Sequence, residues 1–214
     1  MYVARYMSTE VTTVRPETSI PEARALLSRS HFRHLPVIDD TDRLAGMVTD
    51  RDLRSAYPSS IMDPREHATA MQQLQETSVS SIMTTRLHTL TLESTLDDAL
   101  LLLDREKIGG LPVLDREGKV AGFFSIRDLT RAYSQLFGIG EPGSALIAVT
   151  DDGNPRPLTR IVRLLEERDI HFNRLVRSQA PDTGEKIIYI RVQTYNISTV
   201  HQALQQAGFE WYNQ

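Results

Sequence analysis

Two stretches in the first two thirds of the chain carry apolar residues at the spacing of one helix face. The positions are Ile20, Ala23, Leu26 and Leu27 in the first stretch, and Leu96, Ala99, Leu100 and Leu103 in the second. Thr18 and Ser94 precede these stretches and are plausible N-caps. The pattern therefore predicts two amphipathic helices of similar length.

Short apolar runs of strand length surround each predicted helix. One run precedes each helix, at residues 11–14 and 87–90, and two follow it, at 35–39 and 44–49 and again at 111–115 and 120–125. A further helix is expected over 51–57 and from 127 to about 136. The predicted order is therefore β-α-β-β-α, occurring twice.

The two sets of elements are copies of one another. At an offset of 76 residues, 20 of the 55 positions from residue 3 to residue 57 are identical without a gap, including Leu35-Pro36-Val37 and Arg51-Asp52-Leu53. A unit of about 55 residues buries little apolar surface alone. We therefore expect the copies to face each other as a pseudo-twofold pair, with clefts at the seam.

The last third of the chain has a different pattern. Strands are expected over 145–149, 170–176, 186–192 and 209–212, with helices ending near residue 168 and at Gly208, a C-terminal cap. The order β-α-β-β-α-β is that of a ferredoxin-like domain. The predicted fold class is thus α+β, divided into repeat 1 (1–60), a connecting helix and linker (61–78), repeat 2 (79–137), a linker (138–143) and a C-terminal domain (144–214).

The duplicated segment resembles the CBS-domain family, present as a tandem pair. The resemblance rests on the Leu-Pro-Val run of each copy, and on residues 46–52 (GMVTDRD) and 122–128 (GFFSIRD). It implies that an adenosyl ligand, either AMP, ADP, ATP or S-adenosylmethionine, binds between the repeats. It also implies a homodimer that relays binding to a regulated protein partner.

The resemblance assigns ligand-binding roles to particular residues. Asp52 and Asp128 would accept the ribose hydroxyls, and Thr49 and Ser125 would contact phosphate or ribose. The candidates for phosphate are Arg51, Arg127, Arg33 and His34. Each opening segment would serve the opposite repeat, with Met7 and Thr12 near Ser125–Asp128, and Met83 and His88 near Thr49–Asp52.

The same residues allow a purely structural interpretation. Thr49-x-x-Asp52 and Ser125-x-x-Asp128 are close to a capping box, in which two side chains satisfy free N–H groups at a helix start. A hydroxyl residue before a helix is also suited to an anion. One residue can serve both roles, so the motif leaves the two interpretations open.

The two copies differ before the Leu-Pro-Val run. The first copy has Arg33-His34 there, and the second has Gly109-Gly110. One cleft edge is therefore charged and the other is bare backbone, unless the glycines serve only as a flexible turn. We expect the two sites to differ in affinity, with one of them empty or weak.

The C-terminal domain resembles the ACT family of regulatory domains. The resemblance rests on the strand–Asp151-x-Gly153–helix opening and on the element order, although Asp169 stands where the family commonly has glycine. It implies Gly153 and Asn154 as contacts for an amino acid, or else an empty domain used for dimerisation. The whole layout also resembles accessory proteins of acetoin utilisation of the AcuB type.

Composition limits the other functions. The formal net charge is −4, which opposes nucleic-acid binding, and the chain has no cysteine. The longest apolar runs have five residues, so neither a membrane span nor a secretory signal is expected, and a cytoplasmic location is the default. His31 and His34 are spaced like a metal pair but lack a third ligand.

The sequence carries none of the motifs of common catalytic sites, so we expect no catalytic residue, no metal and no covalent cofactor. The predicted function is a non-enzymatic sensor that binds an adenosyl ligand. The alternatives are a ligand-free dimerisation module and an amino-acid sensor acting through the ACT-like domain.

Overall fold

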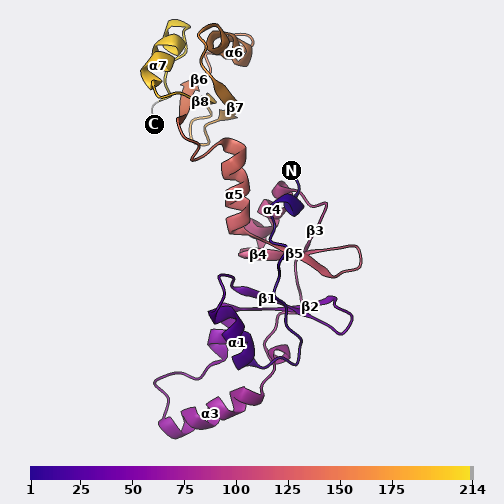
Figure 1. Cartoon of the computed structure of the whole chain (residues 1–214). Coiled ribbons are helices and arrows are strands. Elements are labelled where there is room, and N and C mark those ends of the chain that lie inside the picture. The colour runs from indigo at the N-terminus through magenta and orange to yellow at the C-terminus, as the bar shows by residue number, and fades with distance from the viewer. Residues whose placement is uncertain (213–214) are drawn as a thin grey trace. The chain divides into compact units, whose positions relative to one another are not determined.

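The structure is a computed structural model that describes residues 1–212, and it divides into two compact units, Met1–Arg131 and Ala132–Gln214. Figure 1 labels the elements of both units. The helix α5 (Ile126–Phe137) begins in the first unit and ends in the second, and every other element lies within one unit. Within the described residues, no helix is long and apolar enough to cross a membrane.

The first repeat contains α1 (Ile20–Ser28), β1 (His34–Ile38), β2 (Leu44–Thr49) and α2 (Asp50–Ala56). The strands β1 and β2 pair in antiparallel fashion, with Leu35 opposite Val48. The predicted opening strand at 11–14 is reduced to one parallel bridge between Val14 and Val37. The other predicted elements of this repeat are confirmed to within a residue or two.

The second repeat contains β3 (Leu90–Thr91), α4 (Leu96–Glu106), β4 (Gly110–Leu114), β5 (Val120–Ser125) and α5 (Ile126–Phe137). Its sheet has the order β3-β4-β5, with β3 parallel to β4 and β4 antiparallel to β5. The predicted β-α-β-β-α order is confirmed here in full. The helix α3 (Pro64–Glu76) precedes this repeat and lies within 61–78, where a connecting helix was expected.

The N-caps of α1 and α4 lie one residue later than predicted. Ser19 accepts a hydrogen bond from the Glu22 backbone N–H, and Thr95 accepts one from that of Asp98. Two residues capable of capping stand side by side at each start. The cap is the one whose side chain reaches the N–H at N3, and the residue before it cannot reach that far.

Each repeat forms a backbone hydrogen bond with the short helix that precedes the other repeat. The Val3 N–H, in the short helix η1 (Val3–Arg5), donates to the Ser94 carbonyl of the second repeat at 2.9 Å. The Val79 N–H, in η2 (Val79–Ser81), donates to the Thr18 carbonyl of the first repeat at 2.8 Å. Both valines are fully buried. This exchange holds the two repeats together.

The core of the first repeat lies between its sheet and its helices. Its central members are Ala23 of α1, Leu35 of β1, Val48 of β2, Leu53 of α2 and Leu74 of α3. The corresponding positions of the second repeat are also buried, at Ala99, Leu111, Phe124 and Leu129. The repeat thus preserves the packing of its core, and the clefts are built on that frame.

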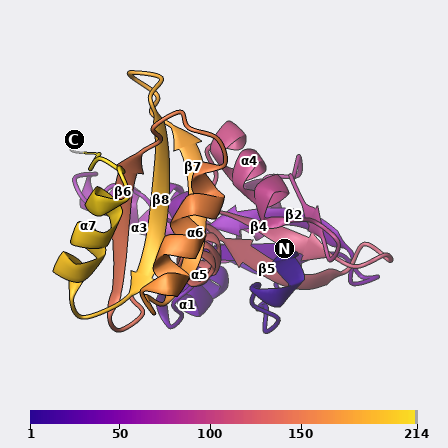
Figure 2. The same cartoon turned by 90° about the horizontal axis from the view of Figure 1, so that it is seen from above.

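The second unit contains β6 (Ser144–Thr150), α6 (Pro157–Glu167), β7 (Phe172–Gln179), β8 (Lys186–Gln193) and α7 (Ile197–Gln206). The strand order is β6-β8-β7. Both helices pack against one face of this sheet (Figure 2), where their apolar residues join one core: Ile147, Ile161, Ile190, Val200 and Leu204.

The end of this unit differs in part from the prediction. The expected last strand is a single antiparallel bridge between Trp211 and Val149 on β6. Gly208 follows α7 with φ of +83°, as expected of a helix C-terminus. Asp169, at the position where ACT domains commonly have glycine, is also left-handed, with φ of +51°. The element order is as predicted up to α7, and the ACT-type assignment stays a prediction.

Candidate functional site

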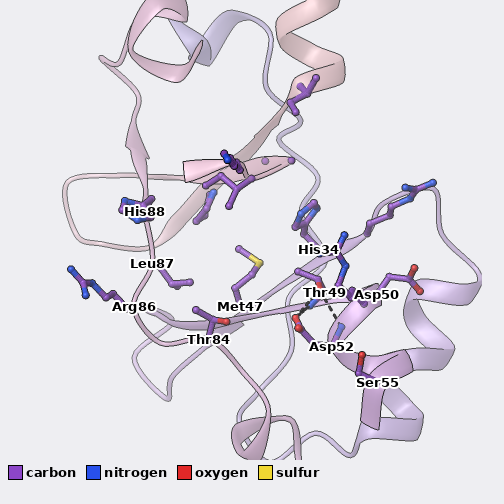
Figure 3. A pocket seen from close by; sticks show the side chains of 18 of the residues that line it. His34, Met47, Thr49, Asp50, Asp52, Ser55, Thr84, Arg86, Leu87 and His88 are labelled. Carbon is purple, nitrogen blue, oxygen red and sulfur yellow. Dashed lines mark hydrogen bonds between the residues drawn. The ribbon is translucent and has the colours of Figure 1, made fainter. Parts of the chain in front are cut away.

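A cavity of about 820 Å³ lies between the two repeats of the first unit. The first repeat contributes the start of β1, part of β2 and the first turn of α2. The second contributes the segment 84–88, the turn after α4 and the start of β4. Figure 3 shows Arg86 and His88 on one side of this cavity, and His34, Thr49 and Asp52 on the other.

The start of α2 presents a capping box to this cavity. The backbone N–H and the hydroxyl of Thr49 donate to Asp52 Oδ2 at 2.8 and 2.6 Å, and the Asp52 N–H donates to Thr49 Oγ1 at 3.3 Å. Within residues 1–212, Asp52 Oδ1 has no hydrogen-bond partner. The helix cap therefore uses one carboxylate oxygen of Asp52, a residue of the cavity lining, and leaves the other without a donor from the described residues.

Five cationic side chains line the same cavity. Arg54 is paired with Asp50 on the same helix. The other four make no salt bridge to any described residue: Arg33, Arg51, Arg86 and Lys107. Because the facing unpaired carboxylate is that of Asp52 alone, the lining has an excess of positive charge. Such a lining favours an anionic ligand.

The cavity also offers apolar side chains and bare backbone. Met47 and Leu87 reach toward its centre (Figure 3), and Ile108 and Pro112 add further apolar surface. Gly109 and Gly110 line the same cavity without a side chain, and Gly110 is buried. A planar, largely apolar group could pack here while charged groups meet the arginines.

His34 is kept neutral by its surroundings. Burial lowers the pKa of its imidazole most, the nearby Arg33 guanidinium lowers it further, and Asp52 opposes both by raising it. Its ring stacks on that of Phe123, with the ring centroids 5.1 Å apart. His34 therefore offers a neutral hydrogen-bonding group, and the formal charge of the cavity comes from the arginines and Lys107.

The second copy of the motif forms the same cap but does not line this cavity. The Ser125 N–H and hydroxyl donate to Asp128 Oδ2 at 2.9 and 2.6 Å. The other oxygen, Oδ1, accepts from Arg131 Nη2 at 2.8 Å. The same nitrogen donates to the Tyr6 carbonyl at 2.6 Å. Asp128 is 7% exposed. The repeat therefore presents two chemically different copies of one motif.

The remaining predicted residues divide between the two repeats. His88 lines the large cavity, and its Nε2 lies 3.3 Å from Oε2 of Glu106, whose pKa is lowered chiefly by its hydrogen bond from Arg105. Arg127 lines a smaller cavity of about 360 Å³, which also includes Arg33 and His31. Thr12 is exposed and lines neither of these two cavities.

Met7 and Met83 occupy matching places. Met83 Sδ lies 2.5 Å from where a Cβ on Gly46 would stand, and Met7 Sδ lies 2.5 Å from the same point on Gly122. Neither methionine is in the lining of the large cavity. Each opening segment thus packs on the opposite repeat, with glycine permitting the close approach, and a role for Met7 and Met83 in ligand binding stays a prediction.

Sequence reasoning missed several lining residues. Arg86, Lys107, Arg54 and Met47 line the cavity although none of them was assigned a role, and Met47 lies within the motif at 46–52. Arg86 could have been found, because it lies two residues before His88 on an opening segment already assigned to that cleft. Arg131 also carried a signal, because its i, i+3 spacing from Asp128 suits an ion pair on a helix.

The predicted loop of the second unit is closed on itself. The Asn154 side-chain amide donates to Asp152 Oδ2 at 2.8 Å, and the Gly153 N–H donates to Asp151 Oδ1 at 3.1 Å. A hydrogen bond from Arg160 is the main cause that lowers the pKa of Asp152. A role for Gly153 and Asn154 in binding an amino acid stays a prediction. Among the described residues, no three His, Asp or Glu side chains are grouped to hold a metal ion.

Residues 3–59 and 79–135, more than half of the chain, match the CBS domain. The chain belongs to the CBS-domain family. A CBS domain-containing protein of Dictyostelium discoideum is 34% identical over 127 residues, 59% of this chain and 87% of that protein. The inosine-5′-monophosphate dehydrogenase of Aquifex aeolicus is 32% identical over 56% of this chain, which is 22% of the enzyme. The CBS pair thus spans about a fifth of that dehydrogenase.

Solved structures share the fold of the CBS pair. CBSX2, a CBS-pair protein of Arabidopsis thaliana, in complex with AMP is 31% identical, with a TM-score of 0.53 over 63% of this chain and 97% of that one. The CBS pair of protein MJ0100, in complex with 5′-methylthioadenosine and S-adenosyl-L-methionine, is 25% identical, with a TM-score of 0.50 over 62% and 99%. The protein named AcuB from Vibrio cholerae shares the fold at 23% identity, with a TM-score of 0.53 over 66% and 96%.

Proposed function

We propose that the CBS pair is a non-enzymatic regulatory module that binds an adenine nucleotide in the cavity beside Asp52. The observation that carries the proposal is the free Oδ1 of Asp52 within a cavity that also has unpaired arginines. A carboxylate oxygen can accept from a ribose hydroxyl, and guanidinium groups suit phosphate. The complexes of CBSX2 with AMP and of MJ0100 with adenosyl compounds support this assignment.

The charge of the cavity distinguishes between the two ligand classes. S-adenosylmethionine carries a sulfonium cation and no phosphate, so it would add positive charge beside Arg33, Arg51 and Arg86. AMP and ATP would instead neutralise these side chains. The proposed ligand is therefore a nucleotide with one or more phosphates, with the base against Met47 and Leu87.

The regulatory part of the proposal follows from the lining. Both repeats supply contacts, so a bound nucleotide favours the arrangement in which both sets of contacts are made. The nucleotide binds this arrangement of the repeats more tightly than others, and the resulting shift in arrangement is relayed to a second copy of the chain or to a protein partner. Acetoin utilisation, as in AcuB-type proteins, is one setting for such a sensor.

Calorimetric titration of the full chain tests the proposal with AMP, ATP and S-adenosylmethionine. We expect AMP or ATP to bind, and Asp52→Ala to weaken binding by about tenfold or more, the range for losing a hydrogen bond to a charged group. The matched control is Asp98→Ala, because Thr95 and Asp98 form the same capping box on α4, outside the cavity. The control should bind like the wild type.

A second pair of variants tests the phosphate contacts. Arg86→Ala should weaken ATP binding, whereas Arg116→Ala, on an exposed arginine outside the cavity, should not. Absence of binding by all three compounds would favour the ligand-free dimerisation module. Tighter binding of S-adenosylmethionine than of AMP and ATP would contradict the choice of a phosphate-bearing ligand.

A further inference from the structure

The 76-residue offset allows the two clefts to be compared position by position. Ser55, exposed on α2 and in the lining of the large cavity, corresponds to Arg131 on α5. Met47 corresponds to Phe123. Both clefts are built on two antiparallel strands followed by a helix that begins with the same capping box. Differences between the clefts therefore come from the side chains at the matching positions.

Arg131 occupies the place where a ligand of the second cleft would bind. Its Nη2 bridges Asp128 Oδ1 and the Tyr6 carbonyl, at 2.8 and 2.6 Å. These contacts give the carboxylate oxygen a donor from the protein itself. The equivalent oxygen of Asp52 has none among the described residues, because Ser55 is too short to provide one.

Phe123 fills a second part of the same cleft. Its ring stacks on His34, and its Cε1 lies 2.4 Å from where a Cβ on Gly110 would stand. Gly110 is buried although it has no side chain. Phe123 therefore occupies space that the less bulky Met47 leaves open in the first cleft.

The cations of the second cleft differ from those of the first. Of the five that line the large cavity, only Arg51 has an arginine or lysine at the matching position, Arg127, although Arg33 also lines the smaller cavity and Arg131 is paired with Asp128. The counterparts of Arg33, Arg54, Arg86 and Lys107 are Gly109, Thr130, Glu10 and His31. The smaller cavity beside Arg127 has neither Ser125 nor Asp128 in its lining. What remains of the second cleft is therefore separated from its ribose-binding motif.

We propose that the pair takes one nucleotide per chain, beside Asp52, because Arg131 and Phe123 close the cleft beside Asp128. This inference rests on the function proposed above and adds its stoichiometry and the residues that set it. Arg131 acts as an internal substitute for the ligand. Its contact with Tyr6 also ties the segment after η1 to α5.

Binding stoichiometry of the full chain, measured by calorimetry and by equilibrium dialysis with labelled AMP, tests the proposal. The wild type should bind one AMP per chain, and Asp52→Ala should remove it. The combined variant Glu10→Arg, Phe123→Met and Arg131→Ser places three residues of the first cleft at the matching positions of the second, and it removes both side chains that close it. It should bind two AMP per chain and return to one when Asp128→Ala is added.

The reciprocal change closes the open cleft without disturbing the second repeat. Ser55→Arg should lower AMP affinity at least tenfold, since the new guanidinium can reach Asp52 Oδ1. Ser55→Gln, long but uncharged, should lower it less than threefold. This pair keeps the proposal testable if the combined variant does not fold.

Three results would overturn the inference. They are two AMP per wild-type chain, loss of the single site by Asp128→Ala but not by Asp52→Ala, and a folded combined variant that still binds one. A wild type that binds no AMP, ATP or adenosine contradicts the proposed function itself. Two equivalents would leave that function intact and refute only the closed second cleft.

Discussion

The two repeats have the same core and different clefts. Leu35 and Leu111 stand at equivalent positions in β1 and β4, and both are fully buried. Asp52 and Asp128 also stand at equivalent positions, yet one faces a large cavity and the other is tied to Arg131. Duplication has therefore preserved the positions that pack, while the positions that face the clefts have changed. Internal symmetry in the sequence predicts shared folding but not shared ligands.

The largest expected effect tests the shared half of this comparison. Leu35→Ala and Leu111→Ala should each lower the free energy of unfolding by about 2–5 kcal/mol, because each removes buried methyl groups and leaves a cavity. The two losses should be similar, since both leucines are fully buried at equivalent positions of the two repeats. Chemical denaturation of each variant measures them.

The control is Leu101→Ala, because this leucine of α4 is 68% exposed and should cost much less. A loss at Leu35 that is several times the loss at Leu111 would contradict equal packing. It would show that the two cores have diverged as much as the clefts have.

The sequence predicted the frame better than the site. Helical spacing and the Leu-Pro-Val runs located nearly all elements of the pair, because packing imposes a period on the apolar residues. The caps of α1 and α4 were misplaced by one residue, since adjacent Ser and Thr residues have the same chemistry. The capping box at Asp52 was identified, and so was its second use as a ligand-binding candidate.

The cleft chemistry needed the three-dimensional structure. Arg86 and Lys107 come from the second repeat to a cavity whose motif lies in the first. The resemblance assigned the segment of His88 to this cleft, so Arg86 was within reach of the prediction, but nothing in the sequence places Lys107 there. The spacing of Arg131 from Asp128 suits an ion pair on one helix. Only the structure shows that the same guanidinium also contacts the Tyr6 carbonyl, far away in the sequence.

A smaller effect tests the difference between the two carboxylates. Asp128→Ala should lower the free energy of unfolding by about 2 kcal/mol or more, because it removes a helix cap and leaves Arg131 without its carboxylate partner. Asp52→Ala should lower it by about 1 kcal/mol, the contribution of a cap alone. Thermal unfolding of the ligand-free variants measures both. Equal losses would mean that the Arg131 contact adds nothing to stability.

The smallest expected effect concerns His34, whose counterpart Gly110 cannot titrate. The pKa of His34 is lowered on folding, so the unfolded chain binds more protons than the folded chain just below its usual value of 6.5. The stability that neutral His34 contributes is therefore full above pH 6.5 and is lost as the pH falls below it. The slope from this one group cannot exceed about 1.4 kcal/mol per pH unit.

Denaturation between pH 5 and pH 8 of the wild type and of His34→Gln isolates this effect, because the other titratable groups contribute equally to both. The wild type should lose stability on acidification faster than the variant does. A carboxylate such as Asp39, whose pKa is lowered mainly by a hydrogen bond from Thr41, acts at lower pH and cancels in the difference. Parallel curves would show that the imidazole does not sense its burial between Arg33 and Phe123, and the asymmetry of the clefts would then rest on the charged residues alone.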